Sequence, residues 1–391
     1  MNDATDGAVA LRHRLHRRPE LSGTERETAR TIAEILTNTH PSRVITGIGG
    51  HGVAACYDSG TPGPRVLLRA ELDALPIADR SRAPHRSECP DVSHACGHDG
   101  HAAILASIGV RIGLDTLGVA RGSVILLFQP AEETGAGGAA VVRDPRWKEL
   151  SPDYAFALHN LPGTPIGTLV YRPGVFAAAS RGVIIHLDGA SAHAAHPEHG
   201  RSPSGTVARA LLAIDAIASD AEKSAAAAQP ASTALPAATI TAVHARLGEP
   251  GFGTSPGDAV VMATLRGFDP DAVDRMEDAL IARITAGADA AGIAVRVDHA
   301  EAFPATVNDP AAVALLLDAA AAAGLPAIAA SSPFRWSEDF GHIGALVPSA
   351  YCCVGAGVDH PDLHTPDYDF PDALLPIGID LYSRLIEQLC G

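Results

Sequence analysis

The chain has 391 residues, of which 47% are apolar and 19% are charged, and its formal net charge is −16. This length predicts two domains, or one large domain with an insertion, and no apolar run is long enough to predict a membrane span. The negative charge argues against nucleic acid and anionic membranes as partners, because both repel an acidic surface. The N-terminus lacks the basic and then apolar order of a secretory signal, so we expect a cytoplasmic protein.

Helical and strand patterns alternate along the first part of the chain. Residues 8–37 have a helical pattern that Pro19 and Gly23 interrupt. Buried strands are predicted by four apolar runs, at 65–75, 122–133, 153–162 and 349–357. This alternation predicts an α/β layered fold. Because open α/β sheets bind ligands where their strands end, we expect the polar residues at these strand ends to converge on one crevice.

The pattern changes near Ser180. A strand at 181–189, a helix at 202–219, strands at 233–246 and 259–268 and a helix at 271–292 are predicted in that order. The order predicts a small antiparallel α+β unit inserted in the larger domain.

Two short motifs contain side chains that bind metals. Cys96 and His98 stand two residues apart before a helical run, and thiolate and imidazole both suit Zn²⁺ and similar ions, although such a pair is more often structural. Glu132 and Glu133 follow an apolar strand, where adjacent carboxylates repel each other unless they share a cation or a proton. A solvated acidic turn is the alternative interpretation of the glutamate pair.

Two further histidines complete this set. His159 lies near the end of the apolar run at 153–162, and His364 lies in the sequence DLHTPDYDF; each by itself is more often an ordinary hydrogen-bonded residue. Taken together, five residues with ligand-type side chains suffice for two metal ions: Cys96, His98, Glu133, His159 and His364. Glu132 is then left to act as a base toward an attacking water and to return the proton to a leaving amine.

Other catalytic motifs are absent from the sequence. It has no G-x-S-x-G nucleophile motif, no P-loop and no G-x-G-x-x-G after a strand. His193, His196 and His199 lie in a histidine-rich stretch at 189–203, where an exposed loop histidine is the default interpretation.

On its motifs, the sequence resembles the dinuclear metallohydrolases of the aminoacylase and carboxypeptidase family. The resemblance is to the branch of hippurate hydrolases, N-acyl amino acid amidohydrolases and auxin-conjugate hydrolases. It extends over nearly the whole chain and rests on the segments LRHRLHRRPELSGTERETA (11–29), LLRAELDALPI (67–77), HACGHDGH (94–101), LLFQPAEETGAGG (126–138), HNLPGTPIG (159–167), HAAHPEHGRSP (193–203), SEDFG (337–341) and HTPDYDF (364–370).

The resemblance implies a fold and a cofactor. It implies an α/β catalytic domain over 1–180 and 301–391, with a mixed sheet flanked by helices, and an inserted ferredoxin-like lid over 181–300 that dimerises. It also implies two divalent metal ions, which can be Zn, Mn, Co or Ni. The implied activity is hydrolysis of the amide bond of small N-acyl amino acids or related conjugates by a metal-bridging hydroxide.

The resemblance also implies roles for single residues. The metal ligands would be Cys96, His98, Glu133, His159 and His364, and Glu132 would be the general base. Asp73 would orient a ligand, and His193 would stabilise the oxyanion, reaching the site of a partner subunit. Arg266 would receive a substrate carboxylate.

Two positions depart from the usual pattern of this branch. Glu71 stands where an aspartate is usual, and Gly253 stands where many relatives have an asparagine that contacts substrate. We expect a modest effect of the first and altered substrate recognition from the second. The alternative functions are a dipeptidase or aminopeptidase on the same scaffold and a non-catalytic metal-binding homologue.

Overall fold

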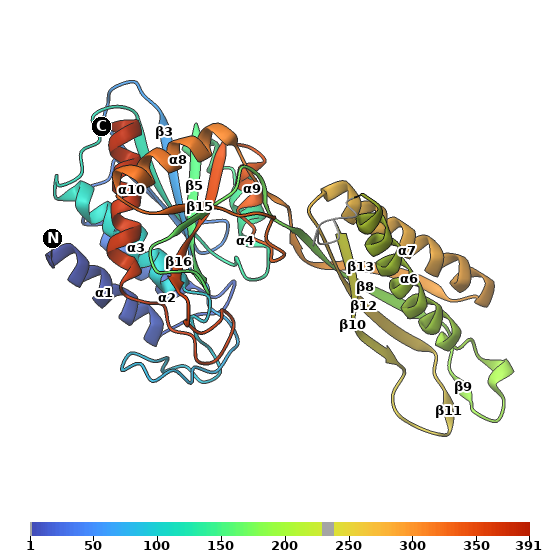
Figure 1. Ribbon diagram of the computed structural model, residues 1–391. Helices are drawn as coiled ribbons and strands as arrows, with labels where there is room; N and C mark the ends of the chain where they lie inside the picture. The colour runs from blue at the N-terminus through green and yellow to red at the C-terminus, as the bar shows by residue number, and fades with distance from the viewer. Residues whose placement is uncertain (1, 229–237) are drawn as a thin grey trace. The chain divides into compact units, whose positions relative to one another are not determined.

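The structure is a computed structural model that describes residues 2–228 and 238–391 (Figure 1). It divides into a larger unit, which runs to Phe176 and includes Thr306–Pro333 and Asp339–Gly391, and a smaller unit of Ala177–Ala305 and Phe334–Glu338. The prediction from sequence divides the chain at 180 and 300 and leaves Phe334–Glu338 in the larger domain. Each unit is described below by itself.

A mixed eight-stranded sheet forms the centre of the larger unit, in the order β1-β2-β4-β3-β5-β16-β6-β15. Its strands are β1 (Arg43–Ile48), β2 (Gly52–Asp58), β3 (Arg65–Glu71), β4 (Ser123–Gln129), β5 (Tyr154–Pro162), β6 (Leu169–Tyr171), β15 (Ala327–Ala329) and β16 (Ser349–Gly357), and a separate pair joins β7 (Gly174–Ala177) to β14 (Thr306–Asn308). The neighbours β4, β3, β5 and β16 are parallel and almost entirely buried, which explains their apolar runs. The four strands predicted from sequence are confirmed, although β3 and β4 end earlier than expected because polar turns follow them.

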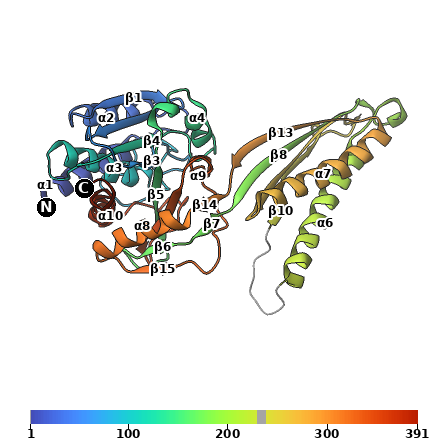
Figure 2. The same ribbon diagram turned by 90° about the horizontal axis from the view of Figure 1, so that it is seen from above.

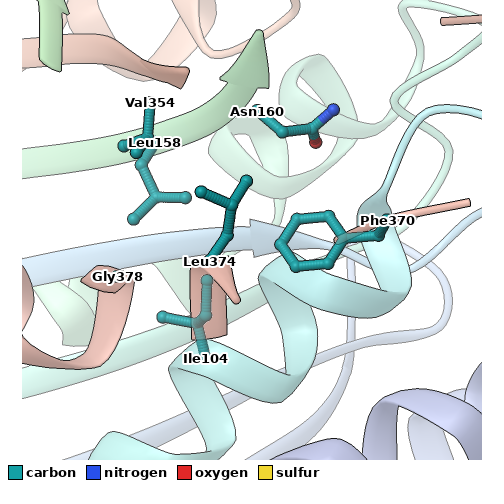
Figure 3. Close-up of a pocket in the computed structure, with 7 residues that line it drawn as sticks. All are labelled: Ile104, Leu158, Asn160, Val354, Phe370, Leu374 and Gly378. Carbon is teal, nitrogen blue, oxygen red and sulfur yellow. The ribbon is translucent and has the colours of Figure 1, made fainter. Parts of the chain in front are cut away.

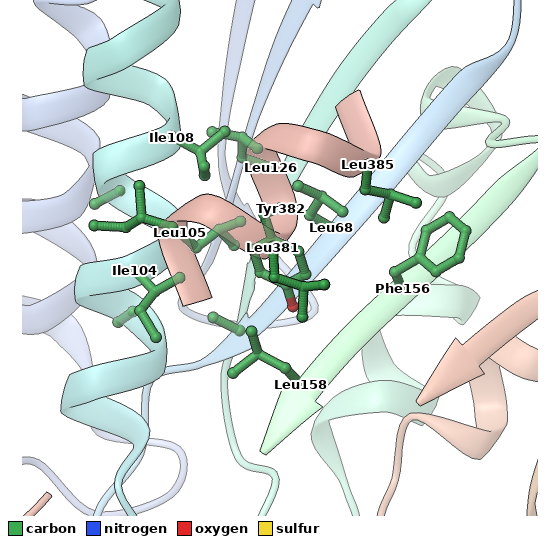
Figure 4. Packing of buried hydrophobic residues seen from close by; sticks show 14 of the residues in the cluster. Leu68, Ile104, Leu105, Ile108, Leu126, Phe156, Leu158, Leu381, Tyr382 and Leu385 are labelled. Atoms are coloured by element: carbon green, nitrogen blue, oxygen red, sulfur yellow. The ribbon is translucent and has the colours of Figure 1, made fainter. Parts of the chain in front are cut away.

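Helices flank this sheet. They are α1 (Asn2–Arg17), α2 (Arg26–Thr37), α3 (His98–Gly113), α4 (Gly137–Arg143), α5 (Trp147–Leu150), α8 (Pro310–Ala322), α9 (Gly341–Gly344) and α10 (Leu374–Cys390). Side chains of α3 and α10, such as Ile104 and Leu385, pack against Leu68, Leu126 and Phe156 of the sheet (Figure 4). Burial of each such side chain stabilises the folded state by about 1.5–3 kcal/mol. This packing fixes the start of α3 beside the ends of the parallel strands.

The smaller unit is a four-stranded antiparallel sheet with two helices. Its main elements are β8 (Ala179–Asp188), α6 (Ser204–Ala228), β10 (Ala238–Leu247), β12 (Asp258–Gly267), α7 (Pro270–Ala291) and β13 (Ala294–Phe303), with the short β9 (Ala192–His193), η1 (Pro197–His199) and β11 (Thr254–Ser255). The helices lie side by side against the sheet (Figure 2). The element order and the strand order β10-β12-β8-β13 are those of a ferredoxin-like fold, as predicted.

The sequence-based prediction of the smaller unit differs from the structure at two elements. It omitted β13, whose side chains are mostly exposed or half-buried, so that it lacks the apolar pattern of a core strand. It also ended the first helix at 219, whereas α6 continues to Ala228. Residues 233–237 of the predicted strand at 233–246 lie outside the described residues. None of the helices in residues 2–228 and 238–391 is both long and apolar enough to span a membrane.

Candidate metal centre

Cys96 and His98 lie at the turn into α3 and are both buried. Gly97 between them has a φ of 93°, a left-handed conformation that glycine adopts without strain. A side chain at this position would also clash, because a Cβ on Gly97 would lie 2.3 Å from Asn160 Oδ1. The Cys-Gly-His sequence therefore permits a tight turn that keeps the thiol and the imidazole inside the larger unit.

Asp73 orients His98. The Nδ1–H of His98 donates to the backbone oxygen of Asp73 at 2.9 Å and lies 3.3 Å from its Oδ1. The other carboxylate oxygen of Asp73 accepts from Ser22 Oγ at 2.7 Å and from the Glu133 N–H at 2.9 Å. His98 Nε2 is left buried without a hydrogen-bond partner among the described residues. An imidazole whose Nδ1 is bound in this way presents the Nε2 lone pair to a metal.

The glutamate pair follows β4 after a turn at Ala131, which has a φ of 52°. His98 Nε2 lies 3.9 Å from Glu132 Oε2 and 3.8 Å from Glu133 Oε1, and the two glutamate side chains are 8% and 9% exposed. The acidic pair is therefore largely buried beside an imidazole and is not the solvated acidic turn considered as an alternative.

Cys96 lies between the two remaining histidines. Its Sγ is 3.3 Å from His159 Nε2 and 3.4 Å from His364 Nε2. His159, in β5, donates its Nδ1–H to the backbone oxygen of Asn160 at 2.8 Å. The Nε2 of His364 is also 3.5 Å from Glu133 Oε2. Both imidazoles thus direct Nε2 at the sulfur.

The ligand-type atoms of these side chains form three overlapping groups, each within 4.8 Å: Cys96–His98–His159, Cys96–Glu133–His364 and His98–Glu132–Glu133. Burial and the neighbouring Glu133 and Glu132 carboxylates raise the pKa of the Cys96 thiol well above its usual range. Burial opposes the charged form of His98, but Asp73, Glu71 and Glu133 outweigh it and raise the pKa to about 10. A divalent cation stabilises such a collection of thiol, imidazole and carboxylate groups, so the residues fit a metal centre. The overlap of the groups favours two adjacent ions.

A buried polar network lies beside these residues, and its members Arg69 and Asp339 had no role predicted from the sequence. His101 Nδ1 is 2.7 Å from Glu71 Oε2, and its ring centroid is 4.6 Å from that of His159. Glu71 also pairs with Arg69, which donates to Asp339 Oδ1 at 2.7 Å. Two signals in the sequence point to this network. Arg69 and Glu71 alternate along β3, with Asp73 two residues further on, and His98 and His101 are three apart on one helix.

Glu71 has a specific role in this network. Burial opposes its ionisation, but Arg69 and His101 outweigh burial and hold the pKa of the Glu71 carboxyl well below its usual range. Glu71 is thus a buried anion, and each of its carboxylate oxygens contacts one of these two partners.

A small cavity lies behind this network. It is lined by Ile104, Leu158, Asn160, Val354, Phe370, Leu374 and Gly378 (Figure 3). Asn160 provides the amide among otherwise apolar lining groups, and the space holds at most about one water molecule. The cavity is therefore too small for a substrate.

The remaining predicted site residues belong to the smaller unit. His193 is exposed on β9, pairs with Thr254 of β11 and accepts from the Ala195 N–H at its Nδ1, at 3.1 Å. The Gly253 backbone oxygen accepts from the Ala194 N–H at 3.0 Å, so Gly253 lies beside His193. Arg266, on β12, donates to Ser337 Oγ at 3.0 Å, and burial lowers its pKa.

Comparisons with known proteins agree with this fold. Residues 67–388 match the peptidase family M20/M25/M40. An N-acetyl-L-cysteine deacetylase of Bacillus subtilis (strain 168) is 30% identical over 97% of this chain and 88% of its own length. A hippurate hydrolase of Campylobacter jejuni is 28% identical over 96% of this chain and 94% of its own length.

A solved structure is also similar. The Bacillus subtilis protein YxeP, described as a dinuclear metal binding peptidase from the M20 family, matches with a TM-score of 0.79 at 22% identity, over 100% of this chain and 99% of that one. The predicted resemblance to a family of hydrolases is thereby confirmed, as is the predicted α/β fold with its inserted unit. From the family match over most of the chain and from the identity to the deacetylase, we conclude that this chain belongs to the peptidase family M20/M25/M40.

Proposed function

We propose that the protein is a metal-dependent amidohydrolase that cleaves the amide bond of N-acyl amino acids or related conjugates, releasing a carboxylic acid and an amino acid. The observation that carries this proposal is the cluster of five ligand-type side chains with Glu132 beside it, in groups whose ligand atoms lie within 4.8 Å of one another. The names of two relatives, an N-acetyl-L-cysteine deacetylase and a hippurate hydrolase, support an N-acyl amino acid as the substrate class.

Two divalent ions, of Zn, Mn, Co or Ni, would be held by Cys96, His98, Glu133, His159 and His364. When bound, such ions lower the pKa of a water molecule and polarise a carbonyl oxygen. Asp73 would support this arrangement through its contacts with His98 Nδ1 and the Glu133 N–H, which fix one ligand from each of two segments.

Glu132 would act as the general base. Its carboxylate is 8% exposed and lies 3.9 Å from His98 Nε2, so it borders the ligand-type atoms. It would accept a proton from the attacking water and return that proton to the nitrogen of the leaving amino acid. A carboxylate in this role is expected to contribute about 10²–10⁴-fold to the rate.

His193 and Arg266 of the smaller unit would contact the substrate, as the family resemblance implies. His193 has an exposed imidazole that would donate to the oxyanion from a partner subunit. Arg266 would receive the substrate carboxylate. We therefore propose that the protein forms a homodimer through its smaller unit. Light scattering of the purified protein tests this dimer. We also propose that the protein is cytoplasmic.

Elemental analysis combined with a panel of N-acyl amino acids tests the proposed function. The wild type should bind two divalent ions and hydrolyse at least one N-acyl amino acid faster than the matching dipeptide. Glu132→Gln should keep the metal content while turnover falls at least about 100-fold. Glu34→Gln, on the exposed face of α2, serves as a control and should leave both properties unchanged. Absence of bound metal, or full turnover of Glu132→Gln, would refute the proposal, and a preference for the dipeptide would favour a peptidase.

A further inference from the structure

Arg12 of α1 is buried although α1 contributes no ligand-type residue to the metal centre. Its side chain is 1% exposed. Its Nε donates to Asp99 Oδ2 at 2.9 Å, its Nη1 donates to Asp372 Oδ1 at 3.1 Å, and its Nη2 pairs with Asp369. One guanidinium is therefore shared among carboxylates that are far apart in the sequence.

These carboxylates belong to two of the three segments that bring ligand-type histidines to the centre, those of His98 and His364. Asp99 follows His98 directly, in the first turn of α3. Asp369 and Asp372 lie in residues 358–373, the connection between β16 and α10 that carries His364. Arg12 thus connects the start of α3 to the segment of His364.

His364 depends more on such contacts than the other histidines of the centre. His98 and His159 lie in a helix and a strand and are buried, whereas His364 lies outside helices and strands, with a φ of 60° and a side chain that is 50% exposed. Near His364, the backbone of its segment is held by the His364 N–H on Ala95 O at 2.8 Å and by the Arg80 N–H on Pro366 O at 2.7 Å.

The charge of Arg12 explains how it keeps α3 and the His364 segment close together. Asp99, Asp369 and Asp372 converge on this guanidinium, and His16 adds a second contact to Asp99, from its Nδ1 at 2.8 Å. Without the guanidinium, the buried Asp99 carboxylate and the partly exposed carboxylates of Asp369 and Asp372 would repel each other, and among the described residues only histidine contacts, those of Asp99 with His16, Asp369 with His85 and Asp372 with His13, would oppose this repulsion. The segment would then move away from α3 and take His364 with it.

We propose that Arg12 is a positioning residue that holds the His364 segment against α3 and thereby retains the ion of the Cys96–Glu133–His364 group. This inference rests on the proposed metal centre. It predicts that loss of Arg12 weakens one metal site more than the other, because the Cys96–His98–His159 group lies at the start of α3 and on β5 and contains no residue of the His364 segment.

Metal binding by Arg12→Gln tests the proposal. Chelator competition should detect one tightly bound ion and a second ion bound at least about tenfold more weakly than in the wild type. About a tenfold loss of affinity is typical when a residue that orients a metal ligand is removed. In the Co²⁺-loaded protein, the visible absorption should change from that of two ions to that of one. Arg12→Lys, which keeps the charge, should restore part of the weaker site. Asp372→Ala, which removes one contact of Arg12, should shift the same site by less.

Arg111→Gln provides a matched control. Arg111 donates to Ser383 Oγ at 2.8 Å and so joins the far end of α3 to α10. This variant should retain both ions. Two unaltered ions in Arg12→Gln would overturn the inference, as would a parallel loss of both ions or an equal effect of Arg111→Gln. If Arg12→Gln does not fold, Arg12→Lys and Asp372→Ala decide the question by the same criterion. A wild type that binds no metal would instead refute the proposed function.

Discussion

Replacement of Asp73 by asparagine tests how one carboxylate supports two ligands. Asp73 Oδ2 accepts from Ser22 and from the Glu133 N–H, so the asparagine oxygen should occupy that position and keep both hydrogen bonds. The amide NH₂ then faces the Nδ1–H of His98, which lies 3.3 Å from Asp73 Oδ1. A donor would thus replace an anionic acceptor.

The structure also limits the size of this effect. Loss of a partner that orients a metal ligand typically weakens metal binding about 10–100-fold, which corresponds to about 1.4–2.7 kcal/mol. The backbone oxygen of Asp73 still accepts from His98 Nδ1 at 2.9 Å and preserves the tautomer. We therefore expect the lower end of this range for Asp73→Asn, about a tenfold loss of affinity.

Zn²⁺ competition with a chromophoric chelator measures this affinity. Ser22→Ala is the matched control, because it removes a hydrogen bond from Asp73 Oδ2 without touching His98. It should cost about 1 kcal/mol of stability and leave the affinity nearly unchanged. The reasoning is wrong if Asp73→Asn binds Zn²⁺ as tightly as the wild type, or if Ser22→Ala weakens binding equally.

Two further predictions concern stability. Gly97→Ala should destabilise the protein more than Gly23→Ala in urea unfolding. Both glycines have positive φ, which costs an alanine about 1–2 kcal/mol, but only at Gly97 would the new Cβ meet Asn160; equal losses would refute the clash. Burial opposes the ionisation of Asp79. The hydrogen bonds that its carboxylate accepts from His16 and from the backbone N–H groups of Ser87 and Ser81 outweigh burial and lower the pKa of Asp79. Its contribution is therefore present above the unfolded-state pKa of about 3.9 and is lost as the pH falls. Asp79→Asn should be about 2 kcal/mol less stable than the wild type at pH 7, with the difference shrinking below about pH 4 in urea titrations; a constant difference would contradict the assignment.

The ligand-type residues could be predicted because parallel strands end at one edge of the sheet. Glu132, Glu133 and His159 each belong to a strand end or the turn after it, so apolar runs with polar ends suffice to find them. Arg12 could not be found in this way, because its contact with Asp99 spans 87 residues and depends on how α1 packs on α3. Likewise, β13 was missed because an edge strand with half-exposed side chains has no distinctive apolar pattern in a single sequence.

The position of β16 in the sheet affects how the protein can fold during synthesis. β16 lies between β5 and β6, although about 190 residues separate it from β5 in the chain, and His364 follows it. On the ribosome, β8 to β13 of the smaller unit emerge before β16 does. The sheet of the larger unit is therefore incomplete until β16 is synthesised, and until then the edge of β5 that pairs with β16 has unpaired backbone N–H and C=O groups. We expect slow, chaperone-sensitive maturation, in which metal uptake reports completion of the sheet.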